Sequence, residues 1–136
     1  MPDALVDTDV FVDHLRGARE FHRPDARVSY SVVTRCELFA GSRVDESVVS
    51  LLLGPFTEIP VTRDIAERAG RLRRLRDIPM ADALIAASAL EWRLTLVTRN
   101  LRHFQQVPDL EIRAPEDPRT ARSSPDVAEG DTSQRR

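Results

Sequence analysis

Three acidic residues lie at positions in the sequence where a carboxylate could do chemistry. Asp7 follows a short apolar segment, Glu37 lies in a helix-forming segment, and Asp82 begins an Ala- and Leu-rich one. Carboxylates held close together resist ionisation unless a cation neutralises them. Oxygen-only ligands suit Mg²⁺ or Mn²⁺, which keep water molecules that can contact a phosphate. If the fold brings these acids together, the sequence predicts a divalent-metal site able to hydrolyse a phosphodiester.

Each acid also has a purely structural interpretation. Asp7 could cap the helix that follows it, because Asp is a preferred N-cap residue. Glu37 could close a capping box with Thr34, three residues before it. Asp82 could complement the dipole of its helix, which favours an acid in the first turn. The metal-site interpretation is favoured because the three acids occur together.

The elements that would position these acids alternate along the chain. Apolar segments predict strands at 4–6, 27–30, 56–61 and 94–97, with a weak one at 111–112. Caps and amphipathic spacing predict helices at 8–16, 34–40, 47–53, from 62 onward and at 79–92. Alternating strands and helices indicate an α/β domain with a mostly parallel central sheet. The loops after such strands meet at one edge of the sheet, where ligands bind.

Composition limits the classes of function. A chain of 136 residues fits one domain with a single core. Its formal net charge of -2 gives no global basic field, so nucleic-acid binding would need a local patch. All 20 basic residues are Arg, which excludes any mechanism that requires a lysine ammonium. The single cysteine, Cys36, excludes an intramolecular disulfide and a cysteine-based zinc cluster.

The apolar stretches and the composition of the C-terminal residues indicate the localisation and the domain limits. We see no signal peptide and no apolar stretch near the ~20 residues that cross a bilayer, so we expect a cytoplasmic protein without a membrane partner. Residues 1–113 carry the predicted elements. Residues 114–136 are rich in Pro, Ser, Asp, Glu and Arg, and we expect a disordered C-terminal tail there.

The motifs around these acids resemble those of the PIN-domain family, specifically the VapC-type toxins of type II toxin–antitoxin systems. The likeness spans 1–113 and rests on LVDTDV at 5–10, SVVTRCELFAG at 31–41, ADALIAASAL at 81–90 and LVTRNLRHF at 96–104. The first motif is weak alone. The third and fourth, correctly spaced after it, make the match specific.

The resemblance implies a PIN-like three-layer sandwich, with helices on both faces of the sheet, and Mg²⁺- (or Mn²⁺-) dependent endoribonuclease activity. It also implies a homodimer and a cognate VapB-like antitoxin that blocks the site. The family's acidic metal-site positions fall on Asp7, Glu37 and Asp82, which are therefore the expected catalytic residues. Its hydroxyl positions fall on Thr8 and Thr98, and a polar position falls on Asn100.

The chain departs from the family in one place. Many members carry a further acid where Asn100 or His103 stands here. Asparagine can ligate a metal but adds no charge, so a second metal should bind more weakly, although Asp9 is near enough to compensate. We leave His103 outside the catalytic set, because a lone His near a strand end is more often structural.

Arginines beside the predicted site are candidates for substrate binding. Arg99 and Arg102 flank Asn100, and a guanidinium can contact phosphate through two hydrogen bonds. The arginines of 63–76 are partly neutralised by neighbouring acids, and we interpret them as surface or dimer rim.

Two other classes of function remain open at this point. Asp7-Thr-Asp-Val10 also fits the opening motif of haloacid-dehalogenase-like phosphatases, in which Asp7 would be the nucleophile. That chemistry usually needs a lysine, and it leaves Glu37 unexplained. The chain could also be a catalytically impaired PIN-like module that binds RNA or protein. Nothing in the sequence identifies which RNA would be cut.

Overall fold

The computed structural model describes residues 3–17 and 27–115 of the chain, and it contains five strands and six helices there. The strands are β1 (Ala4–Val6), β2 (Val28–Ser31), β3 (Thr57–Ile59), β4 (Thr95–Val97) and β5 (Ile112–Arg113). The helices are α1 (Thr8–Leu15), α2 (Val32–Phe39), α3 (Glu46–Leu53), α4 (Arg63–Leu75), α5 (Met80–Trp92) and α6 (Leu101–Phe104). The expected tail lies outside the described residues from 116 onward, so its disorder stays a prediction.

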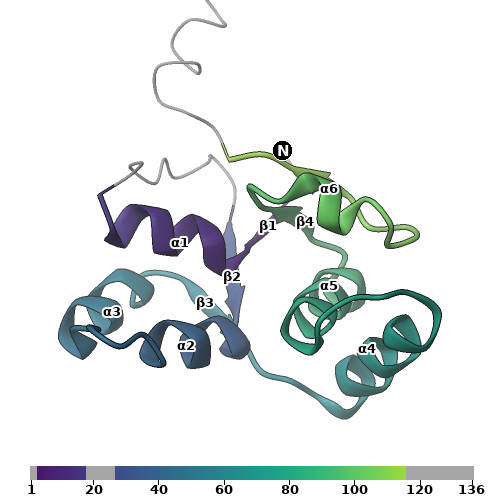
Figure 1. The fold of residues 1–136 in the computed structure, drawn as a ribbon, viewed down its shortest axis with the longest axis horizontal. Coiled ribbons are helices and arrows are strands. Elements are labelled where there is room, and N and C mark those ends of the chain that lie inside the picture. Colours follow the sequence, from purple (N-terminus) through teal and green to yellow (C-terminus); the bar gives the residue numbers. More distant parts are fainter. Residues whose placement is uncertain (1–2, 18–26, 116–136) are drawn as a thin grey trace, which may run out of the picture.

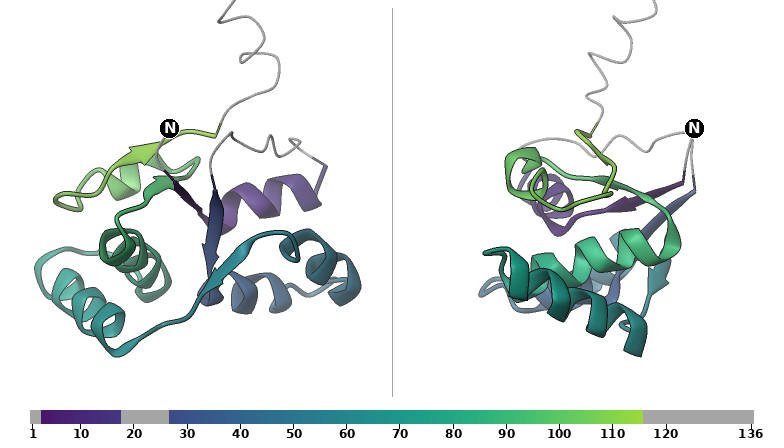
Figure 2. Two further views of the ribbon diagram at one scale, coloured as in Figure 1. Left: turned by 180° about the vertical axis from the view of Figure 1, so that it is seen from behind. Right: turned by 90° about the vertical axis from the view of Figure 1, so that its right-hand side faces the viewer.

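The strands form one parallel sheet in the order β3-β2-β1-β4-β5. The central strand is β1, in which Ala4 lies opposite both Val28 of β2 and Thr95 of β4. Because the strands are parallel, their arrows point the same way and their C-terminal ends meet at one edge (Figure 2). The residues that follow β1 are therefore enclosed by the ends of β2 and β4.

Helices cover both faces of this sheet, which confirms the predicted three-layer α/β sandwich. Figure 1 shows α1, α2 and α3 on one side of the sheet and α4 and α5 on the other. Alternate strand residues enter two cores. Leu5 and Leu96 pack with α4 and α5, whereas Ala4, Val6 and Val97 pack with α1, α2 and α3. The alternation fixes the register, since a shift by one residue would exchange the two faces.

The middle of helix α5 is enclosed between the sheet and α4, whereas Met80 and Trp92 at its two ends are exposed. Its middle, from Ala83 to Ala89, is buried except for the partly exposed Leu84. Alanines allow α4 and α5 to pack closely, and the one buried hydroxyl, that of Ser88, donates to the Leu84 carbonyl at 2.8 Å. Arg93 ends the helix in the left-handed conformation, with φ 56°. The first turn of α5, which carries Asp82, is thus held in place by the buried middle of the same helix.

Two local features differ from the sequence-based expectations. Helix α2 begins at Val32, where the Ser31 hydroxyl caps it by accepting from the Val33 N–H at 3.0 Å. The alternative interpretation, in which Thr34 and Glu37 form a capping box, is therefore excluded, because both residues lie inside the helix. The short helix α6 was not predicted, since four residues carry too little periodicity to be detected.

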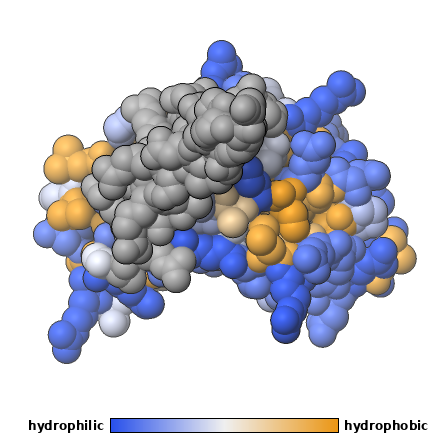
Figure 3. Space-filling model, turned by 90° about the horizontal axis from the view of Figure 1, so that it is seen from above, coloured by the Kyte–Doolittle hydropathy of each residue, from blue (hydrophilic) through white to orange (hydrophobic). Residues whose placement is uncertain are grey.

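The surface is largely polar, with some large hydrophobic side chains exposed. The face seen in Figure 3 has a patch of hydrophobic residues next to hydrophilic ones. The most exposed large hydrophobic residues of the described ranges are Leu51, Leu75, Met80 and Trp92. Exposed apolar groups of this size are common at contacts with other proteins. None of the helices in the described ranges has the length and hydrophobicity that a bilayer-spanning segment requires.

Core packing around α5 gives a first prediction. Ile85 is fully buried, so Ile85→Ala should lower the free energy of unfolding by about 2–5 kcal/mol through lost burial and a cavity. Leu75 is 71% exposed, so Leu75→Ala should change it by less than about 0.5 kcal/mol. Urea denaturation measures both. Equal effects of the two substitutions would contradict the described packing.

Candidate active site

Asp7 is the first residue after the central strand, and both of its carboxylate oxygens are engaged. Oδ1 accepts a hydrogen bond from the backbone N–H of Thr8 at 2.8 Å, which makes Asp7 the N-cap of α1. Oδ2 accepts from the hydroxyl of Thr98, just after β4, also at 2.8 Å. Only 5% of Asp7 is exposed. It is therefore a helix cap and, at the same time, a buried carboxylate at the sheet edge.

The Thr98 hydroxyl connects the end of β4 to two carboxylates. Besides Asp7 it lies 3.3 Å from Oδ2 of Asp9, and it accepts from the backbone N–H of Asn100 at 3.0 Å. A hydroxyl has one proton, so it donates to one carboxylate at a time. Asp9 also accepts from the backbone N–H of Arg99 at 3.2 Å. The loop after β4 thus holds both acids of the first motif.

Glu37 reaches the same region from α2. The Thr8 hydroxyl donates to Oε1 of Glu37 at 2.6 Å and lies 2.8 Å from the hydroxyl of Thr34. Thr34 is fully buried, whereas Glu37 is exposed. From the sequence, Thr34 was considered only as a helix cap. Its place beside Glu37 could have been predicted from their spacing, because residues three apart lie on the same face of a helix.

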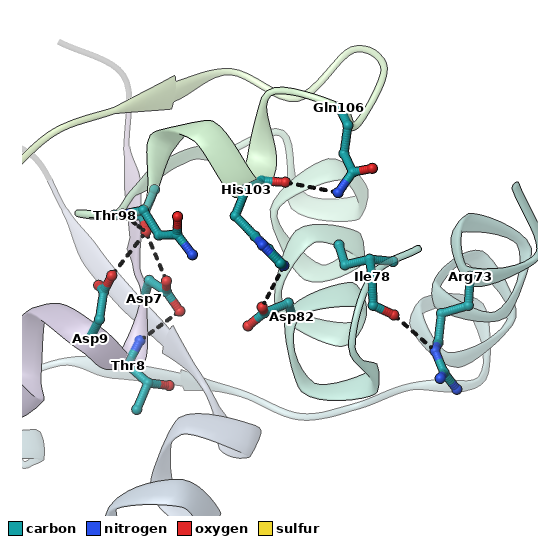
Figure 4. Close-up of polar contacts among 10 residues, drawn as sticks. Asp7, Thr8, Asp9, Arg73, Ile78, Asp82, Thr98, His103 and Gln106 are labelled. Atoms are coloured by element: carbon teal, nitrogen blue, oxygen red, sulfur yellow. Dashed lines mark hydrogen bonds and ion pairs between the residues drawn. The ribbon is translucent and has the colours of Figure 1, made fainter. Parts of the chain in front are cut away.

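Asp82 reaches the site from the first turn of α5, where it meets an unexpected partner. Nε2 of His103, on α6, forms an ion pair with Oδ2 of Asp82 at 3.1 Å. The His103 ring lies edge-on to the buried Phe104 ring, with a centroid distance of 5.7 Å. Figure 4 shows the Asp7 and Asp82 carboxylates facing a common space. The excluded residue His103 is therefore in contact with one of the three selected acids.

Electrostatic coupling joins the acids. The pKa of Asp7 is raised from its ordinary 3.8 to about 7. Burial is the largest cause and the charges of Asp9 and Asp82 add to it, whereas hydrogen bonds from Thr98 and Thr8 lower the pKa. Burial also raises the pKa of Asp9. Both charges that act on Asp7 among the described residues are thus negative. A proton or a cation is needed to neutralise it.

The pKa of Asp82 also depends on the charges of neighbouring acids. Burial is the main cause that raises its pKa; the charge of His103 lowers it, and those of Glu37 and Asp9 raise it. Asp7, Asp9, Glu37 and Asp82 therefore influence one another, although they come from three helices and the end of a strand. A common metal site for Asp7, Glu37 and Asp82 stays a prediction.

The acids form an open arrangement. Within residues 3–17 and 27–115, no group of three Asp, Glu, His or Cys side chains is placed so that it could hold a metal ion without some movement of the side chains. Asp7, Glu37 and Asp82 are each held by a different partner. An oxygen-rich, negatively charged and half-open donor set fits a hydrated Mg²⁺ or Mn²⁺, which keeps several waters, better than a closed structural site.

The expected substrate-binding residues differ in their availability. Nε of Arg99 forms an ion pair with Oδ2 of Asp13 on α1 at 2.7 Å, and this side chain is only 20% exposed. Arg102 is exposed on α6. Asn100 is also exposed, and its side chain makes no capping hydrogen bond to α6. Arg102 and Asn100 are therefore more open to a substrate than Arg99.

A groove of about 670 Å³ opens beside Glu37. It lies between α1, α2 and α3, and its apolar lining includes Val12, Leu38 and Val49. Arg16 and Arg43 also line it, so a bound segment would meet both apolar and basic side chains. Any chain that filled this groove would lie against the acidic site.

Fold and site define an α/β protein with coupled acidic residues at the C-terminal edge of a parallel sheet. A family model described as the PIN domain matches residues 4–110. The chain is 38% identical over 122 residues to "Ribonuclease VapC19" of Mycobacterium tuberculosis, covering 79% of this chain and 96% of that protein. It is 42% identical over 118 residues to "Ribonuclease VapC10" of the same species, covering 78% and 89%. This chain belongs to the PIN-domain family.

Solved structures show the same likeness. A chain of a toxin–antitoxin complex from Klebsiella pneumoniae superposes with a TM-score of 0.68 and 30% identity, covering 85% of this chain and 99% of that one. A chain of a VapBC complex from Mycobacterium tuberculosis superposes with a TM-score of 0.60 and 29% identity, covering 83% and 99%. The predicted PIN-like sandwich is therefore confirmed.

The raised pKa of Asp7 predicts a cost to stability. Its value of about 7 lies above the ordinary 3.8, so the folded protein binds more protons than the unfolded chain between these pH values. Stability without metal must then fall as pH rises from about 4 to about 7. Asp7→Asn keeps an acceptor for the Thr8 N–H and removes the charge. Without divalent cations it should stabilise the fold at pH 8 by roughly 2–4 kcal/mol.

Urea denaturation in a chelator at pH 8 and pH 4 measures this effect, which should nearly vanish at pH 4. Asp109→Asn is the matched control, because Asp109 is an exposed carboxylate with φ 67°, a conformation that Asn tolerates. It should change the stability by less than about 0.5 kcal/mol at either pH. A destabilised Asp7→Asn protein at pH 8 would contradict the described electrostatics.

Proposed function

We propose that this chain is a divalent-metal-dependent endoribonuclease and the toxin of a VapBC-like toxin–antitoxin pair. The observation that carries the proposal is the buried Asp7 carboxylate, whose electrostatic neighbours Asp9 and Asp82 are also negative. Such a charged group is unfavourable when buried among like charges and favourable beside a cation. Relatives named as ribonucleases match over most of their length, which supports RNA as the substrate.

The metal ligands we propose are Asp7 and Asp82, directly or through water, with Glu37 assisting. A bound Mg²⁺ or Mn²⁺ supplies charge to stabilise a phosphodiester under in-line attack and lowers the pKa of a bound water. Thr98 holds Asp7 in place through Oδ2. Thr8 holds Glu37 through Oε1, which leaves the other carboxylate oxygen of Glu37 to orient the attacking water.

Contacts to RNA are proposed for the exposed residues next to this site. Arg102 on α6 can bind a phosphate in a bidentate manner, and Asn100 can hydrogen-bond to the substrate or to a metal-bound water. Arg99 is held by Asp13 and fixes Asp9 through its backbone N–H. We therefore assign Arg99 first to positioning, and to phosphate contact only after its ion pair opens.

The partner we propose is a VapB-like antitoxin, as in the complexes to which the chain is similar. The groove beside Glu37 offers apolar and basic contacts to such a segment, which would shut RNA out of the site. A homodimer is proposed as well, and the exposed Leu75, Met80 and Trp92 are candidate contacts for it. Sedimentation of the antitoxin-free protein tests the dimer.

The competing phosphatase hypothesis loses its support. The chain belongs to the PIN-domain family, and it has no lysine to hold a phosphoryl group. Both Asp7 oxygens also accept hydrogen bonds, which lowers their nucleophilicity. A catalytically impaired RNA-binding module stays the alternative, and its signature is RNA binding without metal-dependent cleavage.

The proposal predicts loss of RNA cleavage on removal of either principal acid. Asp82→Asn and Asp7→Ala should each lower the cleavage rate at least about 100-fold, because both remove charge from the cation site. The rate is measured on purified, antitoxin-free protein, with Mg²⁺ or Mn²⁺ and with a chelator. Sequencing of RNA 5′ ends after brief induction in cells, with Asp7→Ala as reference, identifies the RNA that is cut.

The matched control for these variants is Asp109→Asn. Asp109 lines a second groove with Arg93 and Leu94, at the N-terminal end of β4 and thus at the opposite edge of the sheet. Its substitution should leave cleavage unchanged. Full activity of both site variants, or wild-type activity that survives complete chelation, would contradict the metal-site mechanism.

A further inference from the structure

The contact between His103 and Asp82 has no role in the function proposed above. Nε2 of His103 lies 3.1 Å from Oδ2 of Asp82, and the two side chains are 29% and 27% exposed. Figure 4 shows the imidazole reaching from α6 down to Asp82 in the first turn of α5, with Asp7 to one side of the pair. The pair therefore lies at the rim of the acidic site, on the side of α6.

The position of the imidazole is itself fixed. The neighbouring Phe104 is 1% exposed and belongs to the core formed with α4 and α5. The His103 ring packs edge-on against the Phe104 ring, with an interplanar angle of 77°. The Gln106 side chain donates to the His103 backbone carbonyl at 3.1 Å, which secures the end of α6. These contacts make His103 a stable point of attachment.

Asp82 needs such an attachment more than the other acids. Asp7 is held by two hydrogen bonds and is almost completely buried. Asp82 is partly exposed, and within residues 3–17 and 27–115 its carboxylate contacts His103. A carboxylate without this contact would rotate about its side-chain bonds, and the entropy of fixing it would oppose cation binding.

We infer that His103 is a positioning residue for Asp82. Its Nε2 holds the Oδ2 oxygen, so the second oxygen, Oδ1, is left to face a single divalent cation between Asp82 and Asp7. This inference rests on the proposed function, because it assumes that a cation binds there. Outer partners that fix a ligating carboxylate commonly change metal affinity by about 10–100-fold when they are removed.

The test is direct Mn²⁺ binding, followed by the electron paramagnetic resonance signal of free Mn²⁺ in a titration of full-length, antitoxin-free protein at pH 8. Wild-type protein should bind one Mn²⁺ per chain at this site. His103→Ala should weaken that binding about 10–100-fold, because it removes the side chain that contacts Oδ2 of Asp82. His103→Gln places an amide N–H close to the position of Nε2, so its affinity should stay within about threefold of wild type.

Controls separate this effect from loss of the fold. Gln105→Ala removes an exposed side chain at the end of the same helix and should leave Mn²⁺ affinity unchanged. Thermal unfolding checks that each variant is folded. His103→Leu fills the space of the ring without a donor and replaces His103→Ala if that variant does not fold. Asp82→Ala gives the affinity of a site that has lost the whole carboxylate.

The outcomes are distinguishable. Equal or tighter Mn²⁺ binding by folded His103→Ala or His103→Leu, with normal wild-type binding, would overturn the inference alone. Equal weakening by His103→Gln and His103→Ala would also overturn it, since a polar group at the position of Nε2 would then not matter. The proposed metal site and the inference would both be overturned if the wild-type protein bound no Mn²⁺. The same holds if its affinity for Mn²⁺ were no higher than that of the Asp82→Ala variant.

Discussion

The desolvation of one carboxylate, that of Asp7, is the constraint on which the site depends. It follows the central strand, where neighbouring strand ends enclose it and leave it 5% exposed. Two hydrogen bonds favour its charged form, but burial and the charges of Asp9 and Asp82 outweigh them and raise its pKa to about 7. The fold thus disfavours the charged form of Asp7, and a bound divalent cation would favour it.

The other acids are each held by a separate partner. Glu37 receives the Thr8 hydroxyl, and Asp82 contacts His103. Asp9 receives the Arg99 backbone N–H. Each partner comes from a different element than the acid it holds, so the packing of the layers sets the geometry of the site. The site is therefore pre-organised but open, which suits an ion that must also accept water and a phosphate oxygen.

Sequence reasoning identified the features that depend on local chemistry or on parallel topology. The apolar segments before Asp7 and after Leu94 gave strands whose ends must adjoin, and the alanine-rich α5 was recognised with its acid in the first turn. The residues that contact each acid could not be predicted from the sequence. The Ser31 cap, which excludes a capping role for Glu37, and the His103 contact with Asp82 depend on helix starts and on a four-residue helix, both of which are set by tertiary packing.

The central claim is that Asp7 and Asp82 share one divalent cation, and a crystal structure of the Mn²⁺-soaked protein tests it most directly. Anomalous diffraction locates manganese independently of any assumption about the ligands. The account predicts a peak between the Asp7 and Asp82 carboxylates, with manganese–oxygen distances of about 2.0–2.4 Å for direct ligands, and with water facing Glu37. A peak that lies elsewhere, or a site that stays without one at saturating Mn²⁺, would contradict it.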